Sequence, residues 1–498
     1  MSENIMVLRQ PLVLFTFTVA LAGCAVGPDY KKPEVSLTDH YLASSQVGQR
    51  TAINDAYLDM WWEGFNDPLL TRFVSIAFNQ NLDLAQASAR ITQARSGLSM
   101  ANVALLPSGD LSASAARNHQ SLETPLGQLL NATPGYDRNG RQYEANMSAS
   151  WEMDLFGGLR RDQEAAMAEY QASEAGKNAT RLVVAAKTAD LYILIRGLQN
   201  RIAIAQHQLE TQQKLVTLVE LLHSRGLAPT RDLDQAKGTR AQTESTIPAL
   251  EANLEEAMNA LDVMLGVPPG TYRNELATVQ NIPSSPQITA MGTPSDLLRR
   301  RPDLIMAERR LAASNARIGA ATAEYYPKFS ITALLGTATA ISTGNMFSSG
   351  ANQATGVLGL RWRLFDFGRI NAQIEMAKGQ EAEAMAAYRQ AALRATEDVE
   401  NALSSLIKRE QQTALLLQSE TSLSQARNSA FVAYQKGAVS MIEVLYADEN
   451  LLRTSDAKAQ AQTEAARSAI AAFKALGGGW EPSKASPGSP NLLSMNAQ

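Results

Sequence analysis

The sequence predicts a mainly helical protein that also contains β-strands and consists of two tandem copies of one structural unit. Three observations support this prediction. Marker residues recur along the chain at two fixed offsets, two segments alternate between apolar and polar side chains, and a proline-free helical stretch of roughly 65 residues follows the strands. Together they indicate a repeated wall of helices and strands.

The tandem repeat is visible in single residues. Asp83–Leu84 and Pro107 recur 220 positions later as Asp303–Leu304 and Pro327. A second set recurs at an offset of 211: Trp151, Phe156–Gly157, Gly226 and Gly266 match Trp362, Phe367–Gly368, Gly437 and Gly477. The offset changes by nine between the prolines and the tryptophans, so one loop there is longer in the first copy. Repetition of this kind favours an assembled wall over a single catalytic pocket.

The N-terminal segment has the pattern of a signal peptide. Arg9 precedes an apolar run over residues 12–21, which is too short to span a bilayer. Cys24 follows Leu21-Ala22-Gly23 directly, a pattern that resembles a bacterial lipobox, in which the cysteine is acylated. Residues 1–23 are therefore expected to be removed, and residues 24–58 to form a lipidated, extended leader. The alternative is an incidental cysteine.

Composition excludes several classes of function. The chain has 498 residues and a net charge of −4, and no basic stripe is visible, so nucleic acid is not an expected partner. Its 4 histidines are not at metal-ligand spacing. No stretch after the signal peptide offers 18 consecutive apolar residues. If the chain crosses a membrane, it must do so as a closed barrel.

The strands alternate with period two. In Tyr143–Glu152, one face carries Tyr143, Ala145, Met147, Ala149 and Trp151, and polar side chains occupy the other. Residues 358–364 repeat this pattern, and the prolines at 107 and 327 precede two further strands, Ser108–Arg117 and Lys328–Gly336. A half-buried sheet of a globular protein would also alternate. The ten-residue length and the tryptophans at equivalent ends favour a membrane barrel. Four strands cannot close a barrel, so the chain must oligomerise.

Long helices follow the second strand of each copy. After Gly157–Gly158 the helical pattern continues to about Ser224. Its second half has a seven-residue spacing typical of a coiled coil, at Leu191, Ile195, Leu198, Ile202, Ala205, Leu209, Gln212, Val216 and Val219. Arg409, Glu420 and Arg427 interrupt the matching seam in the second copy. Gly226 and Gly437 are expected to reverse the chain into antiparallel partner helices.

These elements divide the chain into a first repeat over residues 59–269, a proline-rich linker over 270–295, a second repeat over 296–477 and a flexible tail over 478–498. The run Arg299–Arg301 lies at the entry of a helix. We interpret it as a solvated charge cluster rather than a phosphate-binding site.

The motifs of the chain resemble those of one family. They are Trp61-Trp62-Glu63-Gly64-Phe65-Asn66-Asp67-Pro68-Leu69 with Asn81-Leu82-Asp83-Leu84, Arg299-Arg300-Arg301-Pro302-Asp303-Leu304 with Ala307-Glu308, Ile318-Gly319 and Tyr326-Pro327, and Trp362-Arg363-Leu364-Phe365-Asp366-Phe367-Gly368-Arg369. This combination, over residues 28–480, is similar to the TolC-like outer-membrane efflux lipoproteins, and in particular to the NodT-like branch that serves RND-type pumps.

The resemblance implies a homotrimer in which four strands per chain form a 12-stranded outer-membrane barrel, continued by a long periplasmic coiled-coil tunnel. It further implies a Gram-negative outer-membrane location, a periplasmic membrane-fusion adaptor, an inner-membrane RND-type pump, and a covalent lipid on Cys24 as the only attached group. The implied function is a passive exit duct for drugs or other small molecules, without enzymatic activity.

The resemblance also implies a periplasmic gate at the hairpin tips. Glu443 matches an inward acidic ring, Asp232 is its first-repeat counterpart, and Tyr434 matches a tyrosine that latches onto that aspartate. Tyr446 stands where relatives have a second acidic residue, so the ring of charge is expected to be smaller. Asp232 also fits a simple helix-start carboxylate favoured by the helix dipole.

Two other classes of function fit less of the sequence. A structural lipoprotein that tethers envelope layers would explain the helices and Cys24, but not the alternating strands with tryptophans at their ends. An enzyme lacks support, because the sequence offers no nucleophile–base set, no phosphate loop and no metal cluster.

Cys24→Ala tests the lipobox. We expect the variant to lose all incorporation of radiolabelled fatty acid, because the thiol is the acylation site, while the barrel can still insert. Metabolic labelling of cells that express wild type and variant measures this. Label that persists at the wild-type level in the variant would refute the assignment.

Overall fold

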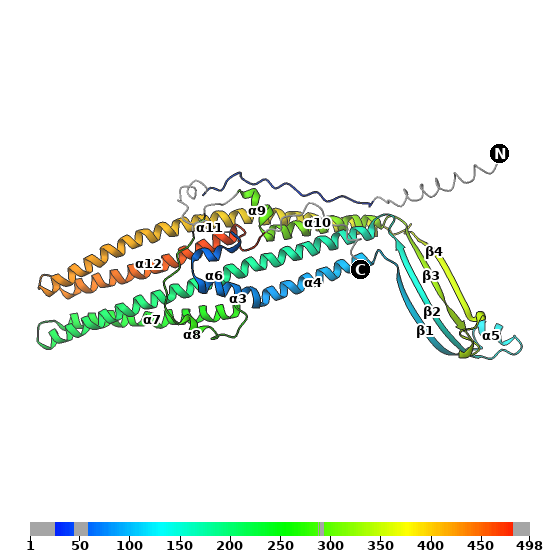
Figure 1. The fold of residues 1–498 in the computed structure, drawn as a ribbon, viewed down its shortest axis with the longest axis horizontal. Coiled ribbons are helices and arrows are strands. Elements are labelled where there is room, and N and C mark those ends of the chain that lie inside the picture. The colour runs from blue at the N-terminus through cyan, green and yellow to red at the C-terminus, as the bar shows by residue number, and fades with distance from the viewer. Residues whose placement is uncertain (1–24, 44–57, 287, 289–292, 482–498) are drawn as a thin grey trace. The chain divides into compact units, whose positions relative to one another are not determined.

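The computed structural model of the chain describes residues 25–43, 58–286, 288 and 293–481 (Figure 1). Cys24, the signal peptide and the end of the tail lie outside the described residues. The chain forms two compact units. The first unit contains Met1–Pro33, Thr92–Ala172 and Glu308–Ala387, and the second contains Glu34–Ile91, Ser173–Ala307 and Tyr388–Gln498.

The principal helices and strands follow the same order in both repeats. The first half of the chain contains η1 (Leu58–Phe65), α3 (Pro68–Gln80), α4 (Leu82–Val103), β1 (Ser108–His119), α5 (Pro125–Asn131), β2 (Asn139–Met153), α6 (Gly158–Ser224), α7 (Thr230–Met264) and α8 (Arg273–Leu276). The second half contains α9 (Pro294–Arg300), α10 (Pro302–Ala323), β3 (Lys328–Thr339), η2 (Thr343–Asn345), η3 (Ser349–Ala351), β4 (Asn352–Arg361), α11 (Arg369–Gln435) and α12 (Met441–Ala475). The predicted succession of helix, strand, strand, long helix and hairpin helix is thus present twice.

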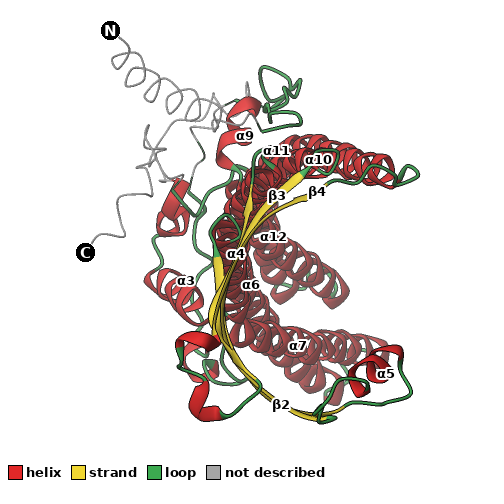
Figure 2. Ribbon diagram, turned by 90° about the vertical axis from the view of Figure 1, so that its right-hand side faces the viewer, coloured by secondary structure: helices red, strands yellow, loops and turns green. Residues whose placement is uncertain are grey.

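The first unit contains an antiparallel sheet in the order β1-β2-β3-β4 (Figures 1 and 2). Its pairing registers repeat with the offsets seen in the sequence. The pair Ser108↔Ser150 of β1–β2 corresponds to Lys328↔Arg361 of β3–β4, at offsets of 220 and 211. The repeat in the sequence is therefore also a repeat of hydrogen-bonded geometry.

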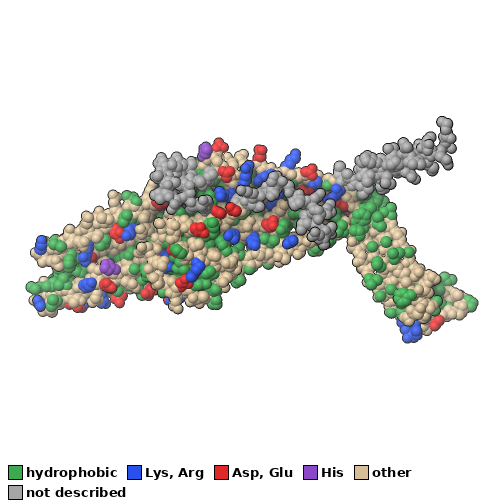
Figure 3. Space-filling model, in the orientation of Figure 1, with side chains coloured by type: hydrophobic (Ala, Val, Ile, Leu, Met, Phe, Trp, Pro, Cys, Tyr) green, Lys and Arg blue, Asp and Glu red, His purple; other side chains and the backbone are tan. Residues whose placement is uncertain are grey.

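The two faces of the sheet differ in polarity. Directly opposed residues of an antiparallel pair project to the same face. Met147 faces Leu111 on one side and Leu335 on the other, and Ile331 faces Leu358. The predicted apolar face of Tyr143–Glu152 therefore continues across all four strands. Figure 3 shows hydrophobic side chains spread over the strands, with charged groups gathered at their far end.

The tryptophans at the strand ends occupy equivalent positions. Trp151 donates from indole Nε1 to the carbonyl oxygen of Leu105 at 2.9 Å, and Trp362 donates to that of Tyr325 at 3.0 Å. The prediction that Trp362 lies within a strand was wrong, because β4 ends at Arg361. β2 continues to Met153 since β3 pairs along it, whereas β4 has no second neighbour in a single chain.

The second unit contains the helical hairpins. Figure 1 shows α7 lying along α6, and α12 along α11. The predicted seam of α6 is buried, except that Leu209 is half-buried. Two of the charged residues that interrupt the second seam, Glu420 and Arg427, have partners on the opposite helix, whereas Arg409 donates to Gln412 of its own helix. Arg427 pairs with Asp448 at 2.6 Å, and Lys458 pairs with Glu420 at 2.5 Å. Polar pairs thus replace apolar contacts in that hairpin.

An aromatic core anchors the N-terminal motif of the second unit. Trp61 is fully buried and stacks on Phe473 of α12, with ring centroids 5.5 Å apart. Tyr192 of α6 donates from its hydroxyl to Asp67 at 2.7 Å, and Asp67 also caps α3 by accepting from the backbone of Leu69 and Leu70. The motif Trp61–Leu69 therefore holds η1 and α3 on the long helices.

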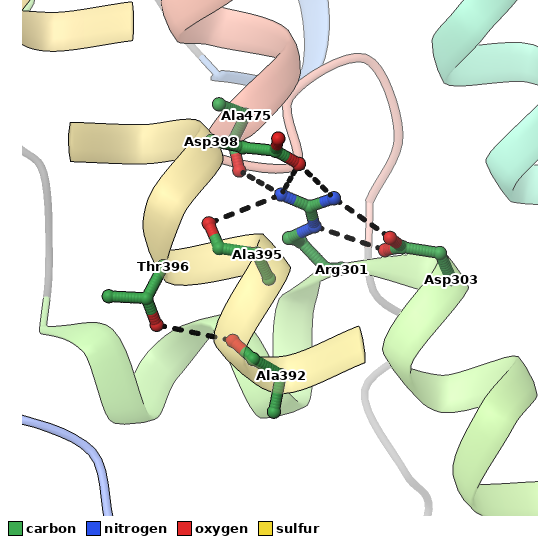
Figure 4. A network of polar contacts seen from close by, with 7 residues as sticks. All are labelled: Arg301, Asp303, Ala392, Ala395, Thr396, Asp398 and Ala475. Atoms are coloured by element: carbon green, nitrogen blue, oxygen red, sulfur yellow. Dashed lines mark hydrogen bonds and ion pairs between the residues drawn. The ribbon is translucent and has the colours of Figure 1, made fainter. Parts of the chain in front are cut away.

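Arg301 joins three helices (Figure 4). Its guanidinium donates to Asp303 at 2.8 and 3.1 Å, to Asp398 of α11 at 3.0 Å, and to the carbonyl oxygen of Ala475 at the end of α12 at 3.3 Å. Its side chain is only 12% exposed. The interpretation of Arg299–Arg301 as a solvated cluster was thus wrong for Arg301, because two carboxylates and main-chain oxygens replace its water.

Gly197 of α6 provides a close approach to α12. A Cβ atom at this position would lie 2.9 Å from Cβ of Thr463, and closer still to its Oγ1. Gly197→Ala should lower the free energy of unfolding by about 1–3 kcal/mol through overpacking. A fall in the midpoint of thermal unfolding would reveal this loss.

Gly238→Ala in α7 is the control. Among the described residues, and apart from its own helix backbone, no atom lies within 4 Å of the position that a Cβ would take there. It should therefore be neutral or stabilise by up to about 1 kcal/mol. Equal midpoints for the two variants would refute the close approach.

Candidate gate at the tips of the helical hairpins

Both hairpin tips turn through the same motif. Gly226 has φ of 73° and Gly437 has φ of 75°, a conformation that favours glycine. The amide of Leu227 donates to the carbonyl of Leu222 at 2.8 Å, and that of Ala438 donates to Ala433 at 2.9 Å. These bonds end α6 and α11 in Schellman motifs, which satisfy carbonyls that the helix ends would leave unpaired. The two glycines therefore set the geometry of the turns.

The four helices of the tips share a core. It contains buried residues of α6, α7 and α12, namely Leu215, Val216, Val219, Ala236, Met441, Val444 and Leu445. Half-buried Phe431 and Tyr434 of α11 pack against it. The two hairpins of one chain are therefore held together near their ends by apolar contacts, and a rearrangement of the tips must break or slide these contacts.

Two of the predicted gate residues, Asp232 and Tyr434, lie near each other at the hairpin tips. Asp232 lies in the first turn of α7 with 9% exposure, and Arg231 donates to its carboxylate at 3.3 Å. Burial raises the pKa of Tyr434, and the negative charge of Asp232 raises it further. The phenol therefore keeps its proton at neutral pH and is available as a donor toward that carboxylate. A latch between the two side chains stays a prediction.

Glu443 and Tyr446 lie on the surface instead. Both belong to the first two turns of α12, and they are three positions apart in the sequence, which places them on one side of the helix. Glu443 is exposed, and Tyr446 is 68% exposed. A single chain therefore presents them to its surroundings, whereas Asp232 is enclosed within its own hairpin pair.

A buried ion pair near the tip was not predicted from the sequence. Asp448 of α12 is 1% exposed and accepts from Nε of Arg427 at 2.6 Å, and the guanidinium lies over the ring of Phe431 at 5.2 Å. Burial raises the pKa of Asp448, and Arg427 only partly offsets that rise. The signal available in the sequence was Arg427 itself, a charge at a seam position that requires a partner.

The described part of the chain offers no helix with the length and apolar character required to cross a membrane. Nor do its His, Cys, Asp and Glu side chains gather in groups of three or more that could hold a metal ion.

Comparison with known proteins identifies the family. The family model for outer membrane efflux proteins matches residues 73–267 and 293–478, one stretch in each repeat. The chain belongs to the outer membrane efflux protein family. This family consists of outer-membrane channel proteins without enzymatic activity, so the predicted family, location and class of function are confirmed.

Individual relatives match nearly the whole chain. Nodulation protein T of Rhizobium leguminosarum bv. trifolii is 31% identical, over 94% of this chain and 97% of its own. The pyoverdine export outer membrane protein OpmQ of Pseudomonas putida is 31% identical, over 84% and 88%. The solved structure of the outer-membrane channel OprN has 31% identity and a TM-score of 0.82, covering 92% of this chain and 100% of its own. The efflux-protein fold, mostly helical with four strands per chain, is thereby confirmed.

The buried Asp448 of this efflux protein should make its stability depend on pH in a defined direction. Since the pKa is raised in the folded state, the charged carboxylate opposes folding, and stability is gained as pH falls through the folded pKa toward the unfolded one. Relative to Asp448→Asn, the wild type should gain unfolding free energy as the pH falls from neutral toward about pH 4, close to the usual pKa of an aspartate. Glu449→Gln, on the exposed side of the same turn, is the control. A difference between wild type and Asp448→Asn that is constant with pH would contradict the assignment.

Proposed function

We propose that three copies of this chain form a passive outer-membrane duct, whose periplasmic end is opened when an adaptor and an inner-membrane pump of the RND type dock onto it. The single observation that carries this proposal is the repeated four-stranded sheet with one apolar and one polar face, which in one chain has two unpaired edges. In lipid such edges require partners, and further copies supply them.

The pump, rather than this chain, selects the molecule that is exported. One relative is named for the export of pyoverdine and another for nodulation, although they share a similar degree of identity with this protein. Channels of one fold therefore work in systems of different purpose. We place this chain in small-molecule export, as a conduit that supplies neither energy nor chemistry.

The proposed gate depends on the core of the hairpin tips. Asp232 is buried there and Tyr434 is half-buried, so removal of the carboxylate and the phenolic hydroxyl is proposed to weaken the contact between α7 and α11. Glu443 and Tyr446 are exposed on α12 and are proposed to face the axis of the trimer. Acylation of Cys24 is proposed to anchor the N-terminal leader in the outer membrane.

Single-channel conductance in a planar bilayer tests the duct. We expect discrete current steps from the wild-type protein, and a several-fold higher open probability from Asp232→Ala combined with Tyr434→Phe, since these changes loosen the tip. Asp234→Ala is the matched control. It removes an exposed carboxylate from the same turn of α7 and should leave the current as in the wild type.

The outcomes separate the two parts of the proposal. Silence from the wild type and from the double variant would favour a structural tether and overturn the duct. Steps of unchanged size and frequency in the double variant would overturn the latch between Asp232 and Tyr434 and leave the duct in place.

A further inference from the structure

Two arginines face each other directly across the first hairpin of the sheet. Arg117 of β1 pairs with Arg141 of β2, two positions from the ends of the strands at His119 and Asn139. The side chains of directly opposed residues start about 4.5–5.5 Å apart, and like charges in that position oppose the pairing. Both arginines are exposed, and no carboxylate of the described residues forms an ion pair with either guanidinium.

The opposite end of the sheet shows what such a pair of cations requires. Lys328 of β3 faces Arg361 of β4, and this pair is also of like charge. There, however, Nζ of Lys328 lies 2.5 Å from a carboxylate oxygen of Glu324 and 3.9 Å from one of Glu152. Acidic side chains of the chain itself therefore compensate one opposed pair, whereas the pair of Arg117 with Arg141 is left uncompensated.

The second repeat shows that the strand pairing does not require the arginines. The offsets of the repeat carry Arg117 and Arg141 to Thr337 and Asn352, and these two residues face each other in the β3–β4 ladder. The same point of the ladder therefore forms there without charge. The segment between β3 and β4, residues 340–351, contains no charged residue either. The arginines of the first repeat therefore serve a purpose other than strand pairing.

The two arginines lie at one end of the apolar face. Because alternate residues of a strand share a face, Arg117 and Arg141 are on the same side of the sheet as Leu111 and Met147. Arg141 lies ten positions before Trp151, which is at the other end of that face. At about 3.4 Å per residue and a tilt of about 40°, this length covers about 25 Å, the height of the apolar band of an outer-membrane barrel.

A third arginine belongs to the same end of the sheet. Arg138 directly precedes β2 and donates from its guanidinium to Nε2 of His119, whose Nδ1 lies 2.8 Å from Oδ1 of Asn139. Asp137 and Glu123 are the only acidic residues between the two strands. The carboxylate of Asp137 accepts from the backbone and side-chain nitrogens of Asn139, at 2.9 and 3.2 Å. Figure 3 shows basic side chains at this end of the strands.

We propose that Arg117, Arg138 and Arg141, here named the basic rim, bind the phosphate groups of a phosphorylated glycolipid in the outer leaflet of the membrane. This inference rests on the proposed duct, which places the helices on the periplasmic side and the basic rim at the outer surface. A guanidinium donates two parallel hydrogen bonds to phosphate oxygens, so one phosphate compensates both opposed arginines. The acyl chains of the same lipid lie along the apolar face, which starts at the next pair, Ala115 and Tyr143.

The strands of a second copy do not offer the missing negative charge. β3 and β4 contain no acidic residue. In β1 and β2 the acidic residues are Asp110, Glu144 and Glu152, and all three lie on the polar face, opposite to the face that carries Arg117 and Arg141. A lipid phosphate approaches from the apolar side, where the uncompensated guanidinium groups are.

Lipid binding by the full-length protein tests the basic rim. The probe is diphosphoryl lipid A, added to the protein purified in dodecyl maltoside, and native mass spectrometry counts the molecules bound per chain. We expect saturable binding by the wild type, and at least about tenfold weaker binding by Arg117→Gln with Arg141→Gln, because charge-assisted hydrogen bonds are lost. Arg90→Gln with Arg95→Gln is the charge-matched control. It removes two exposed arginines from α4 and should bind lipid A as the wild type does.

Thermal unfolding separates a role in binding from a role in folding. Without lipid, Arg117→Gln with Arg141→Gln should unfold at or above the wild-type temperature, because the repulsion between the opposed charges is removed. Diphosphoryl lipid A should raise the midpoint of the wild type, but not that of the double variant. Equal stabilisation of both proteins by the lipid would overturn the proposal, as would a double variant that already unfolds earlier in its absence.

Two further probes identify what is bound. Diacylglycerol, which has acyl chains but no phosphate, should not compete with lipid A, and equal binding of the two would reduce the contact to the apolar face. Inorganic phosphate in large excess should leave lipid A bound, and displacement by it would indicate a site for free phosphate instead. Conductance of the same preparation separates this inference from the proposed function. A protein that conducts but does not bind lipid A through the arginines refutes the basic rim alone, and one that does neither refutes both.

Discussion

The structure depends on the pairing of main-chain hydrogen-bonding groups along the sheet. β2–β3 joins the two repeats of one chain, and its register gives the whole sheet one apolar and one polar face. Unpaired N–H and C=O groups are costly in lipid, so the two free edges make a single copy incomplete. The duct of several copies that we propose follows from this one constraint.

The helical unit depends on a different kind of contact, because polar pairs join its long helices alongside the apolar seam. Arg301 donates hydrogen bonds to the carboxylates of Asp303 and Asp398 and to the carbonyl of Ala475 at the end of α12. The ion pair of Arg427 with Asp448 replaces an apolar contact between α11 and α12. Buried ion pairs add little net stability compared with hydrophobic contacts, but one left without its partner is strongly destabilising. We therefore interpret these pairs as devices that set the alignment of neighbouring helices, Arg301 at the C-terminal end of α12 and Arg427 near the apolar core of the hairpin tips.

The candidate gate was only partly accessible to sequence reasoning. Its four side chains came from a resemblance to a family. The structure places buried Asp232 and half-buried Tyr434 at the core of the tips, and Glu443 and Tyr446 on the exposed surface. The distinction depends on which helix face packs against the other hairpin, and spacing within one helix does not reveal it. Arg427 was visible as an interruption of the heptad pattern, but its partner Asp448 lies 21 residues away on the returning helix.

The sequence alone determined the tandem repeat, the two faces of the strands and the extent of the long helix Gly158–Ser224, because period-two alternation, helical spacing and fixed offsets are local properties of the chain. Only the tertiary structure decided that β4 ends at Arg361, that Arg301 is buried, and that α6 touches α12 at Gly197. Each of these depends on which neighbour a segment finds across the fold. A strand ends where its partner does, and a charge is solvated only where no other element covers it.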